Sequence, residues 1–283
     1  MSEVVSVKPV VLAAPGRGVD LRVRISAPVG GGEWPLIVFS HGFGSSLEGY
    51  GPLADYWAGR GFVVVQPTHL DSRTVGLAQG DPRVPEIWRF RVRDLKLILD
   101  RLDEVEARVP GGIDRGRIAV AGHSFGGQTA GNLLGLRVRG GEDYRDERVK
   151  AGVLLATAGN GGADLTPFAA ERFPFMNPEF AGMETPALVV VGDKDDSPLS
   201  HRGAEWMADP YRHSPGRKSL LTVFGAEHSL GGIVGYEAAE TTDESPERVA
   251  LIQRVTTAYL RSALYSEEFT VEVDAGLGSI ESK

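Results

Sequence analysis

Short apolar segments alternate along the chain with longer segments in which apolar and polar residues recur at helical spacing. Each short segment is aliphatic or β-branched and is followed by a polar or turn-forming residue. The short segments lie at 36–39, 62–65, 118–121, 153–156, 187–191 and 220–224. Strands that are buried on both faces of a parallel sheet have this composition. The alternation predicts an α/β fold, in which a mostly parallel central sheet carries helices on both faces.

The amphipathic segments give the predicted helices. They lie at 52–60, 86–108, 128–136 and 246–264. In the second of them, Leu95, Leu99 and Leu102 recur every three or four residues with charged residues between them, which is the pattern of a helix with one apolar face. Near the N-terminus, residues 19–27 alternate with period two and are predicted to pair with residues 4–12 at the beginning of the sheet.

The chain carries no internal repeat and no long linker. We therefore expect residues 1–265 to form a single domain, and residues 266–283 to form a C-terminal tail or an edge strand with its alternating part at 269–273. Residues 157–185 contain glycine and proline and are too few for an independent helical domain. They predict a short lid loop that covers a pocket.

Composition excludes several classes of function. The net charge of −8 disfavours nucleic acid and anionic membranes as partners, because both favour basic surfaces. The absence of cysteine excludes disulfides, thiolate metal sites and a cysteine nucleophile. No apolar segment approaches the length of a membrane span, and no signal peptide is visible, so a cytoplasmic location is expected. Nothing in the sequence indicates an oligomeric state.

The most informative chemistry lies between the apolar segment 118–121 and the helical segment that follows it. The pentapeptide Gly122-His123-Ser124-Phe125-Gly126 has the form Gly-x-Ser-x-Gly. A strand, this motif and a helix in succession predict a nucleophile elbow, a sharp turn that exposes the serine hydroxyl. The glycines are expected because neighbouring backbone passes too close for side chains. Chance matches occur in a chain with 37 glycines, so the context of the motif decides.

A serine nucleophile needs a base within hydrogen-bond reach and an acid that orients this base. His228 follows the last apolar segment, where a loop at the carboxyl edge of the sheet would carry it, and is the predicted base. The other five histidines follow earlier strands, lie inside the elbow or fall in a polar helical segment: His41, His69, His123, His201 and His213. The acid should lie between Ser124 and His228 in the chain. Asp193, Asp195 and Asp196 all follow the segment 187–191 and compete for this role.

Stabilisation of an oxyanion requires backbone N–H donors. One donor is predicted at Phe125, directly after the nucleophile. The other is predicted in the glycine-containing loop 40–46, at Phe43 or, as the alternative, at Gly44.

These pieces resemble α/β-hydrolases of the dienelactone hydrolase, platelet-activating-factor acetylhydrolase and chlorophyllase type. The resemblance covers residues 35–264. It rests on His41-Gly42-Phe43, the helix from Arg91 to Leu102, Asp114-Arg115-Gly116-Arg117-Ile118 before the elbow, the elbow itself, the Gly192 to Asp195 turn, and His228. It implies the α/β-hydrolase fold and a serine esterase without a cofactor. The strand–Gly-x-x-Asp spacing of this superfamily selects Asp195 as the acid, with Asp196 and Asp193 behind it. The serine departs from dienelactone hydrolases proper, whose nucleophile is cysteine.

We therefore expect a serine carboxylic ester hydrolase that acts through an acyl-enzyme on a small to medium, partly apolar ester. A thioesterase or amidase with the same triad, and a non-catalytic ligand-binding protein with this fold, are the alternatives. The predicted pocket walls, besides Phe43, are Gly44, His69, Trp88, Phe168, Phe173, Phe175 and Met176. No metal site is predicted, since phosphate-loop and zinc motifs are missing and the acidic residues at 142–147 lie among arginines.

Overall fold

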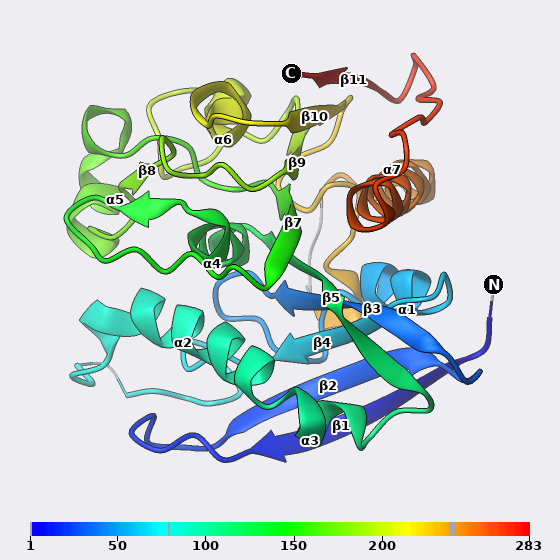
Figure 1. Cartoon of the computed structure of the whole chain (residues 1–283). Helices are drawn as coiled ribbons and strands as arrows, with labels where there is room; N and C mark the ends of the chain where they lie inside the picture. The colour runs from blue at the N-terminus through cyan, green and yellow to red at the C-terminus, as the bar shows by residue number, and fades with distance from the viewer. Residues whose placement is uncertain (1, 79, 238–241) are drawn as a thin grey trace.

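The computed structural model describes residues 2–78, 80–237 and 242–283, and a nine-stranded sheet lies at their centre (Figure 1). The strand order is β1-β2-β4-β3-β5-β7-β9-β10-β11. The inner strands β4, β3, β5, β7, β9 and β10 pair in parallel, while β1, β2 and β11 pair in antiparallel fashion at the two ends. The predicted mostly parallel sheet is confirmed, as is the pairing of the two N-terminal strands.

The strands of the large sheet are β1 (Val4–Leu12), β2 (Leu21–Pro28), β3 (Glu33–Ser40), β4 (Val63–Pro67), β5 (Gly112–His123), β7 (Val149–Leu155), β9 (Ala187–Gly192), β10 (Lys218–Val223) and β11 (Gly278–Ser282). A separate antiparallel pair joins β6 (Arg137–Val138) to β8 (Pro178–Glu179). The helices are α1 (Gly51–Ala58), α2 (Ile87–Asp100), α3 (Leu102–Glu106), α4 (Phe125–Leu134), α5 (Pro167–Arg172), α6 (Asp209–His213) and α7 (Pro246–Tyr265), with short 3₁₀ turns at Val84–Glu86, Gly162–Asp164, Ala204–Ala208 and Gly235–Glu237.

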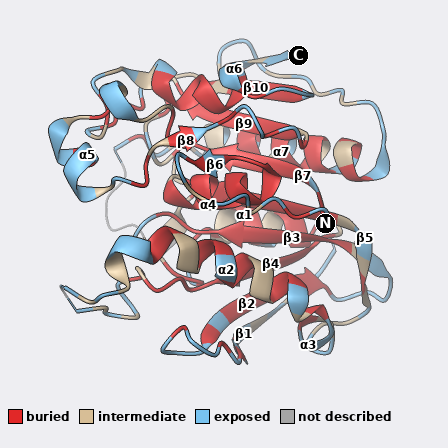
Figure 2. Cartoon of the chain, turned by 60° about the vertical axis from the view of Figure 1, so that its left-hand side comes forward, coloured by how far each residue is buried: buried red, intermediate tan, exposed pale blue. Residues whose placement is uncertain are grey.

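Helices cover both faces of the sheet, and the strand residues alternate between them. In β3, Leu36 and Val38 pack in the core that α2 and α4 cover, whereas Ile37 and Phe39 pack in the core under α1 and α7. The inner strands are therefore buried from both sides (Figure 2). Burial of each such side chain contributes about 1.5–3 kcal/mol to folding. Within the described ranges, no helix combines the length and apolar character that a membrane crossing requires.

Two predicted elements differ from the structure. The predicted helix 86–108 is two helices, because Arg101 leaves helical geometry at φ −116° and ψ 29° between α2 and α3. Leu102 and Val105 stay buried after this break, so the apolar spacing continues through it and gives no signal in the sequence. The strand in the C-terminal segment is Gly278–Ser282 and not the alternating part at 269–273, whose apolar residues pack on the core under α7 instead.

The parallel strands all point their carboxyl ends to one edge of the sheet. The segments that follow β3, β5, β9 and β10 therefore meet there, although they are far apart in the chain. Ligand sites of open α/β sheets form at this edge.

Candidate functional site

The elbow is built as predicted from its sequence. β5 ends at His123, α4 begins at Phe125, and Ser124 lies between them at φ 56° and ψ −123°. A side chain at Gly122 would collide with the carbonyl oxygen of Gly126, and one at Gly126 would collide with that of Ser40. Glycine is therefore required on both sides of Ser124, because backbone occupies the space of a Cβ atom.

A single imidazole joins the three residues that the sequence singled out. His228 Nε2 lies 2.9 Å from Ser124 Oγ, and His228 Nδ1 lies 2.9 Å from Asp195 Oδ2. The Asp195 side chain is 2% exposed, while that of His228 is 47% exposed. A serine, histidine and carboxylate in this order can move a proton off the serine hydroxyl. The competing Asp193 accepts the amide of Gly225 at 2.6 Å, so it holds the turn before His228 instead.

The two amides that were predicted as oxyanion donors lie beside Ser124 in the fold. Phe43 lies in the loop after β3, and Phe125 is the first residue of α4, whose N–H has no partner within the helix. Among the described residues, no oxygen accepts a hydrogen bond from either amide. Both amides can therefore donate to a bound molecule.

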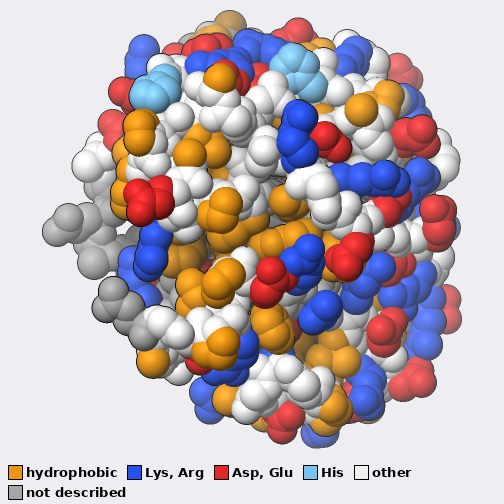
Figure 3. Space-filling view, turned by 90° about the vertical axis from the view of Figure 1, so that its left-hand side faces the viewer, with side chains coloured by type: hydrophobic (Ala, Val, Ile, Leu, Met, Phe, Trp, Pro, Cys, Tyr) orange, Lys and Arg blue, Asp and Glu red, His pale blue; other side chains and the backbone are white. Residues whose placement is uncertain are grey.

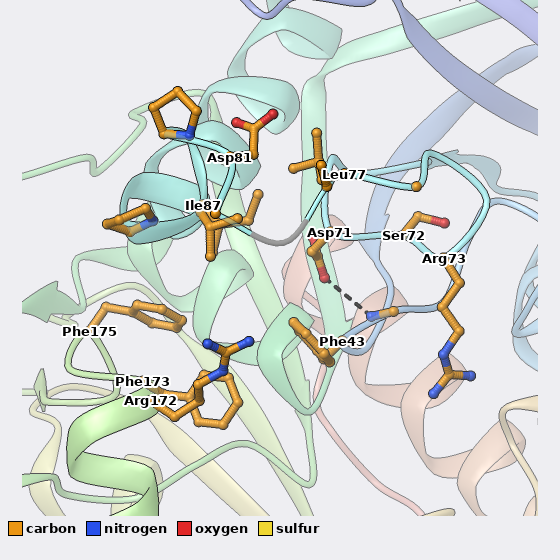
Figure 4. A pocket seen from close by; sticks show the side chains of 17 residues that line it. Phe43, Asp71, Ser72, Arg73, Leu77, Asp81, Ile87, Arg172, Phe173 and Phe175 are labelled. Carbon is orange, nitrogen blue, oxygen red and sulfur yellow. Dashed lines mark hydrogen bonds between the residues drawn. The ribbon is translucent and has the colours of Figure 1, made fainter.

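A buried ion pair between Asp71 and Arg91 holds the Phe43 loop in place. Asp71 accepts the amide of Gly44 at 3.2 Å (Figure 4) and the Nε of Arg91 at 2.9 Å. Arg91 is fully buried on α2, donates to the carbonyl of His41 at 2.7 Å, and lies 4.3 Å over the Phe125 ring. Burial is the largest single influence and would raise the pKa of Asp71, but the charge of Arg91, the imidazoles of His41 and His69 and the Gly44 amide together outweigh it and hold this pKa at about 2. Asp71 is therefore a carboxylate at neutral pH.

The predicted wall residue His69 lies inside a buried network and not at a cavity surface. Its Nδ1 lies 2.9 Å from Asp94 Oδ2 and its Nε2 lies 2.9 Å from Ser40 Oγ. Arg17 pairs with Asp94 at 2.7 Å. Burial lowers the pKa of His69, and burial raises that of Asp94 to about 6 against the opposing charge of Arg17. Both ring nitrogens of His69 are bonded to these buried partners, so His69 does not line the substrate cavity as predicted.

An apolar cavity of about 340 Å³ opens beside Ser124 and His228. Its lining includes the predicted Phe43, Phe173, Phe175 and Met176, all but Phe43 from the segment expected to form a lid loop. That segment is not a bare loop, because it contains α5 and β8. Figure 3 shows apolar side chains gathered in the middle of the face that carries α5 and the beginning of α2. The cavity can hold an apolar group next to the serine hydroxyl.

Two further cavities meet this one at Phe43. The larger, of about 620 Å³, shares Phe43, Phe173 and Phe175 with it and is bounded by Leu77, Pro82, Val84, Pro85 and Ile87 (Figure 4). The predicted Gly44 lines this larger cavity. The third, of about 470 Å³, lies on the Glu237 side of Ser124 and His228. The Phe43 side chain, 57% exposed, is a wall of all three cavities.

Two other predicted wall residues lie elsewhere. Trp88 packs edge-on against Tyr144 at 5.8 Å and is 5% exposed, so it belongs to the core beside α2. Phe168 is 62% exposed, does not line any of the three cavities, and packs edge-to-face with Phe173, their ring centroids 6.1 Å apart. Their aromatic character was the reason for predicting them, and it does not distinguish a cavity wall from a core or surface position.

Sequence reasoning missed residues that the fold brings in from a distance. Trp206 is fully buried and lines the cavity at Ser124, and Glu237 binds Ser45 and Ser46 in the Phe43 loop. One signal was present for Arg91. It lies four residues before Leu95, so a charged residue falls on the apolar face of its helix, where only a buried partner can hold it.

The sequence is similar to chlorophyllases and to platelet-activating factor acetylhydrolases. The chlorophyllase family model matches residues 8–140, less than half of the chain. Platelet-activating factor acetylhydrolases of Canis lupus familiaris and Bos taurus are 24% and 28% identical, over 83% of this chain and 58% of each relative. The chain therefore spans less than two thirds of the length of these relatives. The resemblance to chlorophyllases and platelet-activating-factor acetylhydrolases is confirmed.

A ferulic acid esterase from Streptomyces cinnamoneus has a similar structure, with a TM-score of 0.65 over 96% of this chain and 93% of that chain at 19% identity. At this identity the similarity concerns the fold, and it confirms the α/β-hydrolase fold that was expected from the sequence.

Proposed function

We propose that the protein hydrolyses carboxylic esters through an acyl-enzyme on Ser124, without a cofactor. The observation that carries the proposal is the imidazole of His228, which lies 2.9 Å from both Ser124 Oγ and Asp195 Oδ2. The names of the similar proteins, acetylhydrolase and esterase, describe the same kind of reaction in those proteins.

In the first half of the reaction, His228 Nε2 accepts the proton of Ser124 Oγ as this oxygen attacks the ester carbonyl. Asp195 accepts the Nδ1–H of the imidazole and stabilises its charged form. The amides of Phe43 and Phe125 donate to the oxyanion of the tetrahedral intermediate. His228 then gives its proton to the leaving alcohol, and the acyl group remains on Ser124.

In the second half, a water molecule takes the place of the alcohol. His228 accepts a proton from this water, whose oxygen attacks the acyl-enzyme carbonyl. The tetrahedral intermediate collapses, the bond to Ser124 Oγ breaks, and His228 returns the proton to that oxygen. The products are the carboxylic acid and the free enzyme.

The cavity supports a small to medium, partly apolar ester as the substrate. Phe125, Phe175, Met176 and Trp206 give it apolar walls, and its volume of about 340 Å³ falls in the range of small-molecule sites. An apolar acyl group would lose contact with water there while its carbonyl reaches Ser124.

A fluorophosphonate probe tests the nucleophile. We expect the probe to label Ser124, and Ser124→Ala to lose the label and to lose about four to six orders of magnitude in kcat on p-nitrophenyl butyrate. Ser229→Ala is the matched control, because Ser229 lines the neighbouring cavity together with Ser124 and His228. The hydrogen bonds of the proposed triad run from His228 to Ser124 Oγ and to Asp195 Oδ2 and do not include the Ser229 hydroxyl. Folded protein that is not labelled and does not turn over would contradict the proposal. Binding of an apolar ligand that survives Ser124→Ala would then favour the non-catalytic alternative.

A substrate panel separates the ester from the thioester and the amide. Butyryl groups on p-nitrophenol, on a thiol and on p-nitroaniline present the same acyl chain with different leaving groups. We expect the highest kcat/KM for the oxygen ester. A higher value for the thioester or the anilide would move the assignment to a thioesterase or an amidase with the same triad.

A further inference from the structure

The side chain of His123, the second residue of the elbow, belongs to a buried series of hydrogen bonds that joins the Phe43 loop to the backbone of His228. The Gly42 amide lies 3.0 Å from Tyr50 Oη, Tyr50 Oη lies 2.9 Å from His123 Nδ1, and His123 Nε2 lies 2.7 Å from the carbonyl oxygen of His228. Tyr50 is 1% exposed and His123 is 3% exposed. This series of hydrogen bonds therefore begins at the Gly42 amide, one residue before Phe43, and ends on the backbone of His228.

The chemistry of its two ends fixes the direction of every bond. The His228 carbonyl can only accept, so His123 Nε2 carries the proton and His123 Nδ1 accepts. Tyr50 must then donate its hydroxyl proton to Nδ1, which leaves its oxygen to accept the Gly42 N–H. Burial and the neighbouring His228 lower the pKa of His123 to about 3, and burial raises the pKa of Tyr50. Both groups are therefore neutral, as this set of bonds requires.

Two features of the backbone accompany this series of hydrogen bonds. Tyr50 adopts a left-handed conformation at φ 61° and ψ 21°, which is uncommon for an aromatic residue, and its own amide donates to Val234 O in the loop after His228 at 2.9 Å. A Cβ atom at Gly42 would lie 2.8 Å from Tyr50 Oη and 3.3 Å from His123 Nδ1. The glycine in His41-Gly42 thus makes room for the two side chains.

We propose that Tyr50 and His123 are positioning residues that fix the Phe43 loop relative to His228. This inference rests on the proposed function, in which the Phe43 amide stabilises the oxyanion and His228 moves the proton. Neither side chain hydrogen-bonds to Ser124 Oγ or to the His228 imidazole, whose partners are Ser124 and Asp195, although the His123 ring lies 4.9 Å from the His228 ring between centroids. Their effect is to keep the Phe43 amide and the His228 imidazole at a fixed distance from each other while the substrate carbonyl becomes tetrahedral. In this step, small displacements of either group lower the rate.

Tyr50→Phe tests the proposal, because the ring still packs against Phe39 (centroids 4.8 Å apart) and only the hydroxyl is lost. Active sites are titrated with a fluorophosphonate, and kcat is expressed per titrated site on p-nitrophenyl butyrate. We expect kcat to fall about tenfold with KM within about twofold of the wild-type value. A purely structural role would lower the melting temperature or the active fraction and leave kcat per site unchanged, and that result would overturn the proposal.

Tyr259→Phe is the matched control. The Tyr259 hydroxyl is also buried, but it finds no hydrogen-bond partner among the described residues. We expect this variant to keep the wild-type kcat per titrated site. An equal loss in both variants would show that removal of a buried hydroxyl, and not the chain of bonds, causes the effect.

His123→Phe and the double variant test whether the two side chains act as one unit. If they do, the double variant loses about as much kcat as Tyr50→Phe alone, since either change breaks the chain. A multiplicative loss of about a hundredfold would overturn the proposal. The Tyr50→Phe measurement stands if His123→Phe does not fold. Wild-type protein that the fluorophosphonate fails to label would instead contradict the proposed function itself.

Discussion

Ser124 holds a backbone conformation that costs a non-glycine residue about 1–3 kcal/mol, and the surrounding structure supplies the compensation. Its amide donates to Leu155 O of the neighbouring strand at 2.8 Å, and its carbonyl accepts the amide of Gly127 at 2.9 Å. Glycines at fixed offsets make this turn possible. The elbow could therefore be predicted from the sequence, because its requirements lie within five consecutive residues.

Gly126→Ala measures this requirement. The added methyl group would collide with the carbonyl oxygens of Ser40 and His41, which belong to the sheet and the adjoining loop and cannot move away. We expect the free energy of unfolding to fall by about 1–3 kcal/mol in urea titrations. Gly30→Ala is the control, since open space surrounds Gly30 and its φ is not positive. Equal stability of the two variants would contradict the steric account.

At the scale of elements, the sequence predicted β1 to β5, β7, β9, β10 and most helices, but it missed β6, β8, α5 and the position of β11 and did not predict the contacts between elements. The apolar patterns of the inner strands depend on local composition, which the sequence displays directly. The pairing of Arg91 with Asp71, and that of Glu237 with Ser46, join segments that are 20 and 191 residues apart. The place of Arg91 on the apolar face of its helix indicates that it has a buried partner, but no local spacing identifies that partner as Asp71. Asp71 and Arg91 were therefore missed as supports of the Phe43 loop.

The ion pair between α2 and the loop that follows β4 should give stability a pH dependence. The pKa of Asp71 is lowered to about 2 in the folded state, so its contribution is present above the unfolded pKa near 3.9 and is lost as the pH falls towards 2. We expect Asp71→Asn to lower the free energy of unfolding by about 2 kcal/mol at pH 7 and by less at pH 3. Urea titrations at both pH values check this. A loss of unfolding free energy in Asp71→Asn that is the same at pH 3 and at pH 7 would contradict this prediction.

At the scale of the whole molecule, the site is a junction of three cavities that share one side chain. Phe43 comes from the loop after β3, while Phe173 and Phe175 come from the segment between β7 and β9. The sequence predicted this aromatic wall, yet it also predicted Trp88 and Phe168, which lie outside it. Residue type alone could not decide, because the same rings serve the core and the surface.

Phe43→Ala should change the size of substrate that the site accepts. Loss of the ring would join the cavity of about 340 Å³ to that of about 620 Å³, while the backbone amide of residue 43 is retained. We expect the ratio of kcat/KM for p-nitrophenyl octanoate to that for p-nitrophenyl acetate to rise several-fold. Phe168→Ala, which removes an exposed ring outside the cavities, should leave the ratio unchanged. An equal loss on both esters in Phe43→Ala would contradict the role of the ring as a wall.

The pairing of β11 with β10 protects the protein from self-association. β10 leads directly into the loop that carries His228, and β11 covers its outer edge from Ser219 to Val223. Proteolytic trimming of the last residues would leave this edge with unpaired N–H and C=O groups, a template to which other chains adhere. Loss of residues far from Ser124 in the chain would thus promote self-association next to the strand that leads to His228.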